Sequence, residues 1–181
     1  HINQVFSAHN KKNPPTVNSG RSEATLRDKT LVVFSDDFDR ALASFVIANG
    51  AASAGAKVTM FFTFWGLNLL KKEGHVKVKK DFMIKMFGLM LPKGSKELKL
   101  SKLNMMGMGA KMMRGIMKKK RIDSLEGMMQ TASEAGITMV ACQMSMDVMG
   151  VKREELYDFV EIGGVATYLA AADESNLNLF V

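Results

Sequence analysis

The sequence predicts an α/β protein, with a three-layer α/β/α sandwich built on a mostly parallel sheet of about five strands. Short runs rich in Val, Phe, Leu and Ile alternate along the chain with longer segments of helical periodicity. Several of these runs are apolar on both faces, which is typical of parallel strands covered by helices. The chain has 181 residues, of which 47% are hydrophobic. It is therefore long enough for one domain with its own core.

The first strand is expected over residues 30–35, where "TLVVFS" is β-branched and aromatic. Asp36 and Asp37 follow it and suit the capping of a helix. That helix is expected over residues 38–54, with Gly55 ending it.

The rest of the chain continues the alternation of strands and helices. A helix beginning with Ser124 as N-cap and ending at Gly136 is expected from "SLEGMMQTASEAG". The other expected elements are strands at 57–64, 137–142, near 159–162 and at 177–181, and a helix from about 164 to 174.

Residues 71–121 form a basic, methionine-rich insertion. They hold sixteen Lys or Arg and three acids, a local charge of +13, so the rest of the chain carries −6 of the total of +7. They also hold nine of the sixteen methionines. We expect helices at about 80–90 and 105–119, joined by a loop around 92–94. Helices rich in Met and flanked by Lys are poorly suited to be exposed to solvent on every face. Residues 81–119 are therefore expected to form much of a subunit interface or a lid beside the reactive site.

Residues 1–28 combine Asn, Ser, Lys and a Pro-Pro pair with few periodic apolar positions, as in a linker or extended arm, which leaves 29–181 as the domain. With a single cysteine there is no internal disulfide, which is compatible with a reducing cytoplasm, and we expect a cytoplasmic protein. No apolar run reaches the length of a membrane span. Three scattered histidines show no metal-ligand spacing, so no metal site is predicted.

The cysteine, Cys142, is the candidate reactive residue. It follows an apolar run, near the carboxyl end of an expected strand, where open parallel sheets bind ligands. Ser145 and Asp147 could cap a helical turn after it, and Lys152 and Arg153 could stabilise a thiolate. The alternative is a buried structural cysteine, which is common for this residue type.

Other chemistries have little support in the residues. No histidine lies in the second half of the chain to serve as a base for Cys142, which disfavours a hydrolase. The glycines of "GMGAKMMRG" lack the context of a phosphate-binding loop. The basic segment has few aromatics and no nucleic-acid signature, so no nucleic acid partner is predicted.

Four stretches taken in order resemble the DsrE/DsrF-like family, in particular its methionine-rich branch of sulfurtransferases and sulfur carriers. They are "KTLVVFSDDFDRALASFVIANGAASAGAKVTMFFTFWGLNLLKK", "LPKGSKELKLSKLNMMGMG", "ACQMSMDVMGV" and "EIGGVATYLAAA". The resemblance covers about residues 28–181. It implies the α/β/α fold, a homo-oligomer, no bound cofactor, and TusA-like or rhodanese-like sulfur-transfer proteins as partners.

The resemblance also implies a role for Cys142, onto which the family's active cysteine maps. It would hold sulfane sulfur as a persulfide and relay it to a partner thiol. Such a thiol is expected at the rim of a pocket, where two proteins can reach it in turn. Gln143, Ser145 and Asp147, with the Gly163–Gly164 turn, are the expected substrate-binding residues.

Two other functions stay open. Cys142 could be the thiol of a redox sensor, oxidised to sulfenic acid or to an intermolecular disulfide. The protein could also be a non-enzymatic interaction module at a partner surface or, less favoured, at an anionic membrane surface, with Cys142 merely structural.

Overall fold

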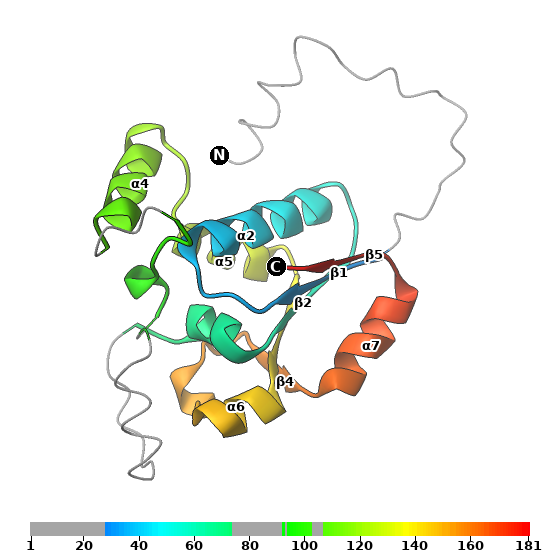
Figure 1. Cartoon of the computed structure of the whole chain (residues 1–181). Helices are drawn as coiled ribbons and strands as arrows, with labels where there is room; N and C mark the ends of the chain where they lie inside the picture. Colours follow the sequence, from blue (N-terminus) through cyan, green and yellow to red (C-terminus); the bar gives the residue numbers. More distant parts are fainter. Residues whose placement is uncertain (1–27, 74–91, 93, 103–106) are drawn as a thin grey trace, which may run out of the picture.

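The computed structural model describes residues 28–73, 92, 94–102 and 107–181. At its centre is a five-stranded sheet in the order β4-β3-β2-β1-β5, in which all neighbouring strands are parallel (Figure 1). The α/β prediction is confirmed. The strands are β1 (Asp28–Val33), β2 (Val58–Phe62), β3 (Thr138–Cys142), β4 (Glu161–Gly163) and β5 (Ser175–Phe180).

Helices lie on both sides of this sheet (Figure 1). The α-helices are α2 (Phe38–Ser53), α4 (Met108–Lys119), α5 (Leu125–Glu134), α6 (Gln143–Met149) and α7 (Val165–Glu174). Short 3-10 helices are η1 (Phe64–Leu70), η2 (Ser95–Glu97) and η4 (Arg153–Glu155).

The strand order explains why α7 lies on the opposite face of the sheet from α2 and α5. From β1 to β4 the chain adds each new strand on the same side of the previous one, whereas α7 leads back across the sheet to place β5 beside β1. Crossovers between parallel strands are right-handed, so a connection that reverses direction passes over the opposite face. α2 and α5 therefore pack together on one face, and α7 covers the other (Figure 1).

The two faces bury very different amounts of apolar surface. The main core lies under α2 and α5 and includes Met60 and Phe62 of β2. The side chain between them, Phe61, points to the other face, because successive residues of a strand alternate. There it forms a small cluster with Val140 and Cys142, against which Tyr168 of α7 packs. The candidate cysteine thus belongs to the thinner of the two cores.

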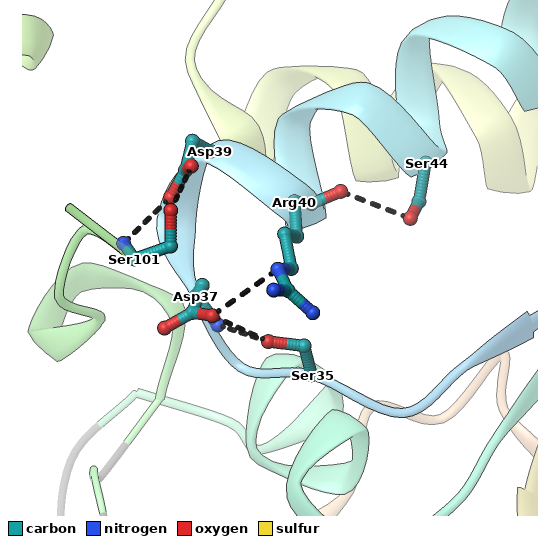
Figure 2. A network of polar contacts seen from close by, with 6 residues as sticks. All are labelled: Ser35, Asp37, Asp39, Arg40, Ser44 and Ser101. Atoms are coloured by element: carbon teal, nitrogen blue, oxygen red, sulfur yellow. Dashed lines mark hydrogen bonds and ion pairs between the residues drawn. The ribbon is translucent and has the colours of Figure 1, made fainter. Parts of the chain in front are cut away.

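The start of α2 differs in detail from the prediction. Asp37 occupies the N-cap position, but its carboxylate makes no capping hydrogen bond. Figure 2 shows the reason: the Ser35 hydroxyl donates to Asp37 Oδ2 at 2.9 Å, and Arg40 Nε lies 3.4 Å from the same oxygen. In the first turn, Asp39 accepts hydrogen bonds from the amide and hydroxyl of Ser101, at 2.9 and 2.5 Å. These bonds tie the chain before α4 to the start of α2.

The other elements agree with the prediction within a few residues. Gly55, with φ 90°, follows the end of α2, and the Ser124 hydroxyl accepts a hydrogen bond from the amide of Gly127 at the start of α5. In the basic insertion, α4 corresponds to the expected helix at 105–119. The expected helix at 80–90 and residues 1–27 of the expected arm at 1–28 lie outside the described residues, while Asp28, the last residue assigned to the arm, begins β1. The sequence did not predict η1, nor the full length of α6.

Candidate functional site

Cys142 is the last residue of β3 and the N-cap residue of α6. β3 ends there because the chain turns directly into the helix, with φ −69° and ψ 114° at Cys142. The cysteine therefore lies at the carboxyl edge of the parallel sheet, as predicted from the sequence.

The thiol is covered in this structure. Cys142 is 5% exposed and packs with Phe61 and Val140 beneath α7. The prediction of a thiol at the rim of a pocket is therefore wrong for this conformation. The physical reason is the alternation of β3: Cys142 points to the same face as Val140, two residues earlier, and on that face Tyr168 of α7 packs against their cluster.

The residues that follow Cys142 divide between the two faces of α6. Ser145 is fully buried, and its hydroxyl is 2.8 Å from the Thr63 hydroxyl at the end of β2. Gln143 and Asp147 are exposed and bonded to each other, with 3.1 Å from Nε2 to Oδ1. Ser145 thus connects two strand ends, whereas Gln143 and Asp147 are on the accessible side.

The expected Gly163–Gly164 turn lies directly beside Cys142. Gly163 is the β4 residue that pairs with Cys142 in the sheet. A Cβ atom on Gly163 would lie 2.8 Å from Val140 Cγ1 and 3.0 Å from Thr167 Oγ1, so the first turn of α7 reaches the sheet only over a glycine. Gly164 is the N-cap residue of α7, and a Cβ there would meet nothing within 4 Å. The structure therefore places Gly163 beside Cys142 in the sheet and Gly164 one residue further on, at the start of α7.

A series of hydrogen-bonded polar side chains begins at Asp36, just after β1, and was not predicted from the sequence. Asp36, expected as a capping residue, instead accepts a hydrogen bond of 2.8 Å from the amide of Asn68. The Asn68 side chain is buried and accepts in turn from Lys71 Nζ at 2.6 Å. Burial raises the pKa of Asp36 above its usual value, although the Asn68 hydrogen bond opposes the shift. Asp36 and Asn68 are 32 positions apart in the sequence, so no local pattern could have paired them.

Lys152 and Arg153, which were expected to stabilise a thiolate at Cys142, make other contacts in the structure. Arg153 donates to the backbone carbonyls of Tyr157 and Asp158, both at 2.9 Å. Lys152 is exposed, and its amide donates to Glu155. Neither contact involves Cys142.

The described part of the basic insertion is also remote from the thiol. Met117 of α4 belongs to the core under α2 and α5, and Arg114 lies over the Phe38 ring at 4.1 Å. α4 lies beside the start of α2 (Figure 1). It is therefore not the expected lid over Cys142, while its role as a subunit interface stays a prediction.

Two classes of site receive no support from the described ranges. No group of three His, Cys, Asp or Glu side chains is arranged to hold a metal ion among those residues. Nor does any helix there combine the length and apolar character that a membrane crossing requires.

Comparison with known proteins decides the family. The model of the DsrE/DsrF/DrsH-like family matches residues 26–180. The chain belongs to this family. The match spans all five strands and includes Cys142 and both glycines beside it.

Two relatives by sequence agree with this assignment. The chain is 48% identical over 152 residues to the uncharacterized protein YrkE of Bacillus subtilis, covering 84% of this chain and 95% of that protein. It is 34% identical over 155 residues to the sulfur carrier protein DsrE2 of Allochromatium vinosum, covering 83% and 96%. Among solved structures it is similar to the YchN protein of E. coli, with 10% identity, a TM-score of 0.45, and coverage of 85% of this chain and 99% of that one.

Proposed function

We propose that this protein is a sulfur carrier that holds sulfane sulfur as a persulfide on Cys142 and passes it to the thiol of a partner protein. The observation that carries the proposal is the position of the chain's single cysteine, at the carboxyl end of β3 and the start of α6, in a family that includes a relative named as a sulfur carrier. The carboxyl edge of a parallel sheet is where such folds hold ligands.

The transfer needs no cofactor and no net oxidation. The Cys142 thiolate attacks the outer sulfur of a donor persulfide, R–S–SH. A new bond forms between Sγ and the outer sulfur, the donor S–S bond breaks, and the donor leaves as a thiolate. The thiolate of the acceptor then attacks the outer sulfur on Cys142 and releases Cys142 as a thiolate. A second cysteine is not required, and none is present.

The exposed side of α6, the helix that begins at Cys142, supports a protein as donor or acceptor. Met144 and Val148 on α6 are 56% and 65% exposed, and they flank the polar pair Gln143 and Asp147. An apolar surface with a few polar groups is typical of protein contacts. We propose that TusA-like or rhodanese-like proteins dock here in the cytoplasm, and that Gln143, Asp147 and the Gly163–Gly164 turn contact the incoming chain.

The outer face of α7 supports assembly of several copies. None of its residues is buried, and Val165 and Leu169 are 64% and 51% exposed. At the neighbouring strand β5, Phe180 is 72% exposed. Exposed apolar groups on adjacent elements often mark an interface. We therefore propose a homo-oligomer that covers part of this face.

Intact-mass spectrometry after incubation with polysulfide tests the sulfur-carrier proposal. Wild-type protein should gain the mass of one or more sulfur atoms, and a thiol reductant should remove them. The Cys142→Ala variant should gain none. Wild-type protein that stays at its original mass, or a variant that gains as much sulfur, would contradict the proposal.

The same experiment separates the carrier from a redox sensor. Mild peroxide would oxidise a sensor thiol to sulfenic acid. The sixteen methionines can also take up oxygen, so the Cys142→Ala variant supplies the background. A sensor gains oxygen on Cys142 with peroxide and no sulfur with polysulfide, whereas a carrier shows the opposite preference.

A second role rests on α4. Met108, Met112 and Ile116 recur every four residues and are 62%, 68% and 51% exposed, so they form a stripe along one side of the helix. They also line a hollow of about 730 Å³, whose other lining residues are Asp39, Leu100, Lys102, Gly109, Met113 and Met117. Exposed lysines flank the stripe at Lys111 and Lys118. An adaptable methionine surface with basic flanks suits an acidic partner protein.

Binding measurements test this second role. A Met112→Gln, Ile116→Gln variant should lose affinity for an acidic partner captured by the wild-type protein, and high salt should weaken wild-type binding. Sedimentation with vesicles of anionic or zwitterionic lipid is the comparison. Binding to anionic vesicles alone would indicate a membrane surface instead.

A further inference from the structure

The proposed carrier function requires a thiol that reactants can reach, yet the structure buries it. Cys142 is 5% exposed, and its neighbours Phe61 and Val140 are 5% and 1% exposed. Phe61 lies on β2, and Val140 and Cys142 lie on the adjacent strand β3, so the three side chains pack together on one face of the sheet. Among the hydrophobic residues of the described part of the chain, Tyr168 of α7 is the one that packs against this cluster from outside it. Tyr168 is therefore the candidate residue for controlling access to the thiol.

Tyr168 is held over the cluster by an aromatic contact. Its ring lies 5.4 Å from the Phe61 ring, centroid to centroid, at an interplanar angle of 35°. In the first six residues of α7, Tyr168 alone is partly buried, and the residues on both sides of it are exposed. Its contact with the sheet is consequently local, and displacing the ring need not disturb the main core under α2 and α5.

The backbone beside Cys142 fixes where the ring lies. Gly163 pairs with Cys142, and the missing Cβ allows Thr167 to sit directly over β4. Thr167 immediately precedes Tyr168, so the close approach of this turn places the tyrosine ring over the thiol cluster. Gly164 begins the helix with open space around it, which permits the turn to adjust.

We infer that Tyr168 is a positioning residue that controls access to Cys142: with its ring on Phe61 it excludes bulky reactants, and displacement of the ring admits them. This inference rests on the proposed function for its biological meaning, because a carrier must shield its persulfide from solvent between two transfers. The ring contact with Phe61 gives the closed state a defined geometry.

Labelling of the single cysteine tests the inference without any sulfur chemistry. Two maleimides of different size, N-ethylmaleimide and fluorescein maleimide, react with the native protein, and each rate is divided by its rate in the unfolded protein. Tyr168→Ala should raise the rate with the bulky reagent by about tenfold or more and reduce the size discrimination. Tyr168→Phe keeps the ring and should stay within about twofold of the wild type.

A control on the same helix separates access from general destabilisation. Asp173→Ala removes an exposed side chain five positions further along α7 and should leave both rates unchanged. The urea dependence of wild-type labelling is the second measurement, because local opening gives a weaker dependence than global unfolding. An unchanged rate in Tyr168→Ala, an equal rise in Asp173→Ala, or wild-type labelling with the full slope of global unfolding would each overturn the inference.

The outcomes for access and for function are distinguishable. Sulfur loading from polysulfide is measured on the same variants. If Tyr168→Ala speeds labelling while no variant takes up sulfur, control of access stands and the carrier function fails. If the wild type takes up sulfur and Tyr168→Ala labels at the wild-type rate, the carrier stands and the role of Tyr168 fails.

Discussion

The tightest backbone contact near the site is at Gly66, and its substitution by alanine gives a sharp prediction. Gly66 lies in η1, directly after β2, and its amide donates to the Phe34 carbonyl at 2.8 Å. A Cβ atom on Gly66 would lie 2.1 Å from the Val33 carbonyl oxygen and 2.9 Å from its carbon. No rotamer can relieve this clash, because the obstructing atoms belong to the backbone of a central strand.

The expected cost follows from that geometry. Overpacking of a core usually costs about 1–3 kcal/mol, and a clash with backbone belongs at the upper end of this range or beyond it. For a chain of this size, about 3 kcal/mol corresponds to a fall in Tm of roughly 6–12 °C. η1 packs against α6, so a backbone movement that relieves the clash at Gly66 would also displace α6, the helix that begins at Cys142.

Urea unfolding followed by tryptophan fluorescence measures this cost. Trp65, the single tryptophan, is the residue next to Gly66. The matched control is Gly50→Ala in α2, where a Cβ would meet nothing within 4 Å. This control should stabilise the protein by about 0.5–1 kcal/mol, since alanine is favoured over glycine inside a helix. The reasoning is refuted if Gly66→Ala unfolds at the wild-type urea concentration or if both variants change stability equally.

Two further predictions concern α5. Ser124→Ala removes the side-chain oxygen that accepts from the Gly127 amide at 3.1 Å, and should cost about 1 kcal/mol in urea unfolding; no loss would show that this cap is irrelevant. Burial of the Glu126 carboxyl opposes its ionisation, but hydrogen bonds, first from the Ser95 hydroxyl at 2.5 Å, hold its pKa below the usual 4.5. Because the folded pKa is lowered, this stabilisation is present above pH 4.5 and is lost as the pH falls through the folded pKa. The stability advantage of wild type over Glu126→Gln should therefore shrink in unfolding experiments between about pH 7 and pH 3, and a constant difference would contradict the assignment.

Local patterns in the sequence determined most of the fold. β2 is buried at every position and apolar except at Thr59, because helices cover both faces of the sheet, and such an apolar run can be recognised in the sequence. Helix ends were predictable where one residue sets the backbone, as at Gly55 and Ser124. η1 was missed because its apolar residues continue the run of β2 without a break, and periodicity cannot distinguish a strand from a short turn of helix there.

For the candidate site too, the sequence alone determined some features and the tertiary structure decided the others. The sequence alone placed Cys142 at a strand end, since the apolar run "ITMVAC" stops there, and it placed a glycine pair where another strand ends. Only the tertiary structure decided that Gly163 pairs with Cys142, that Ser145 bonds to Thr63, and that Tyr168 packs against the cluster that contains Cys142. Those contacts depend on which strands become neighbours and over which face α7 returns, and both are settled by packing across the whole sheet rather than by any segment of the chain.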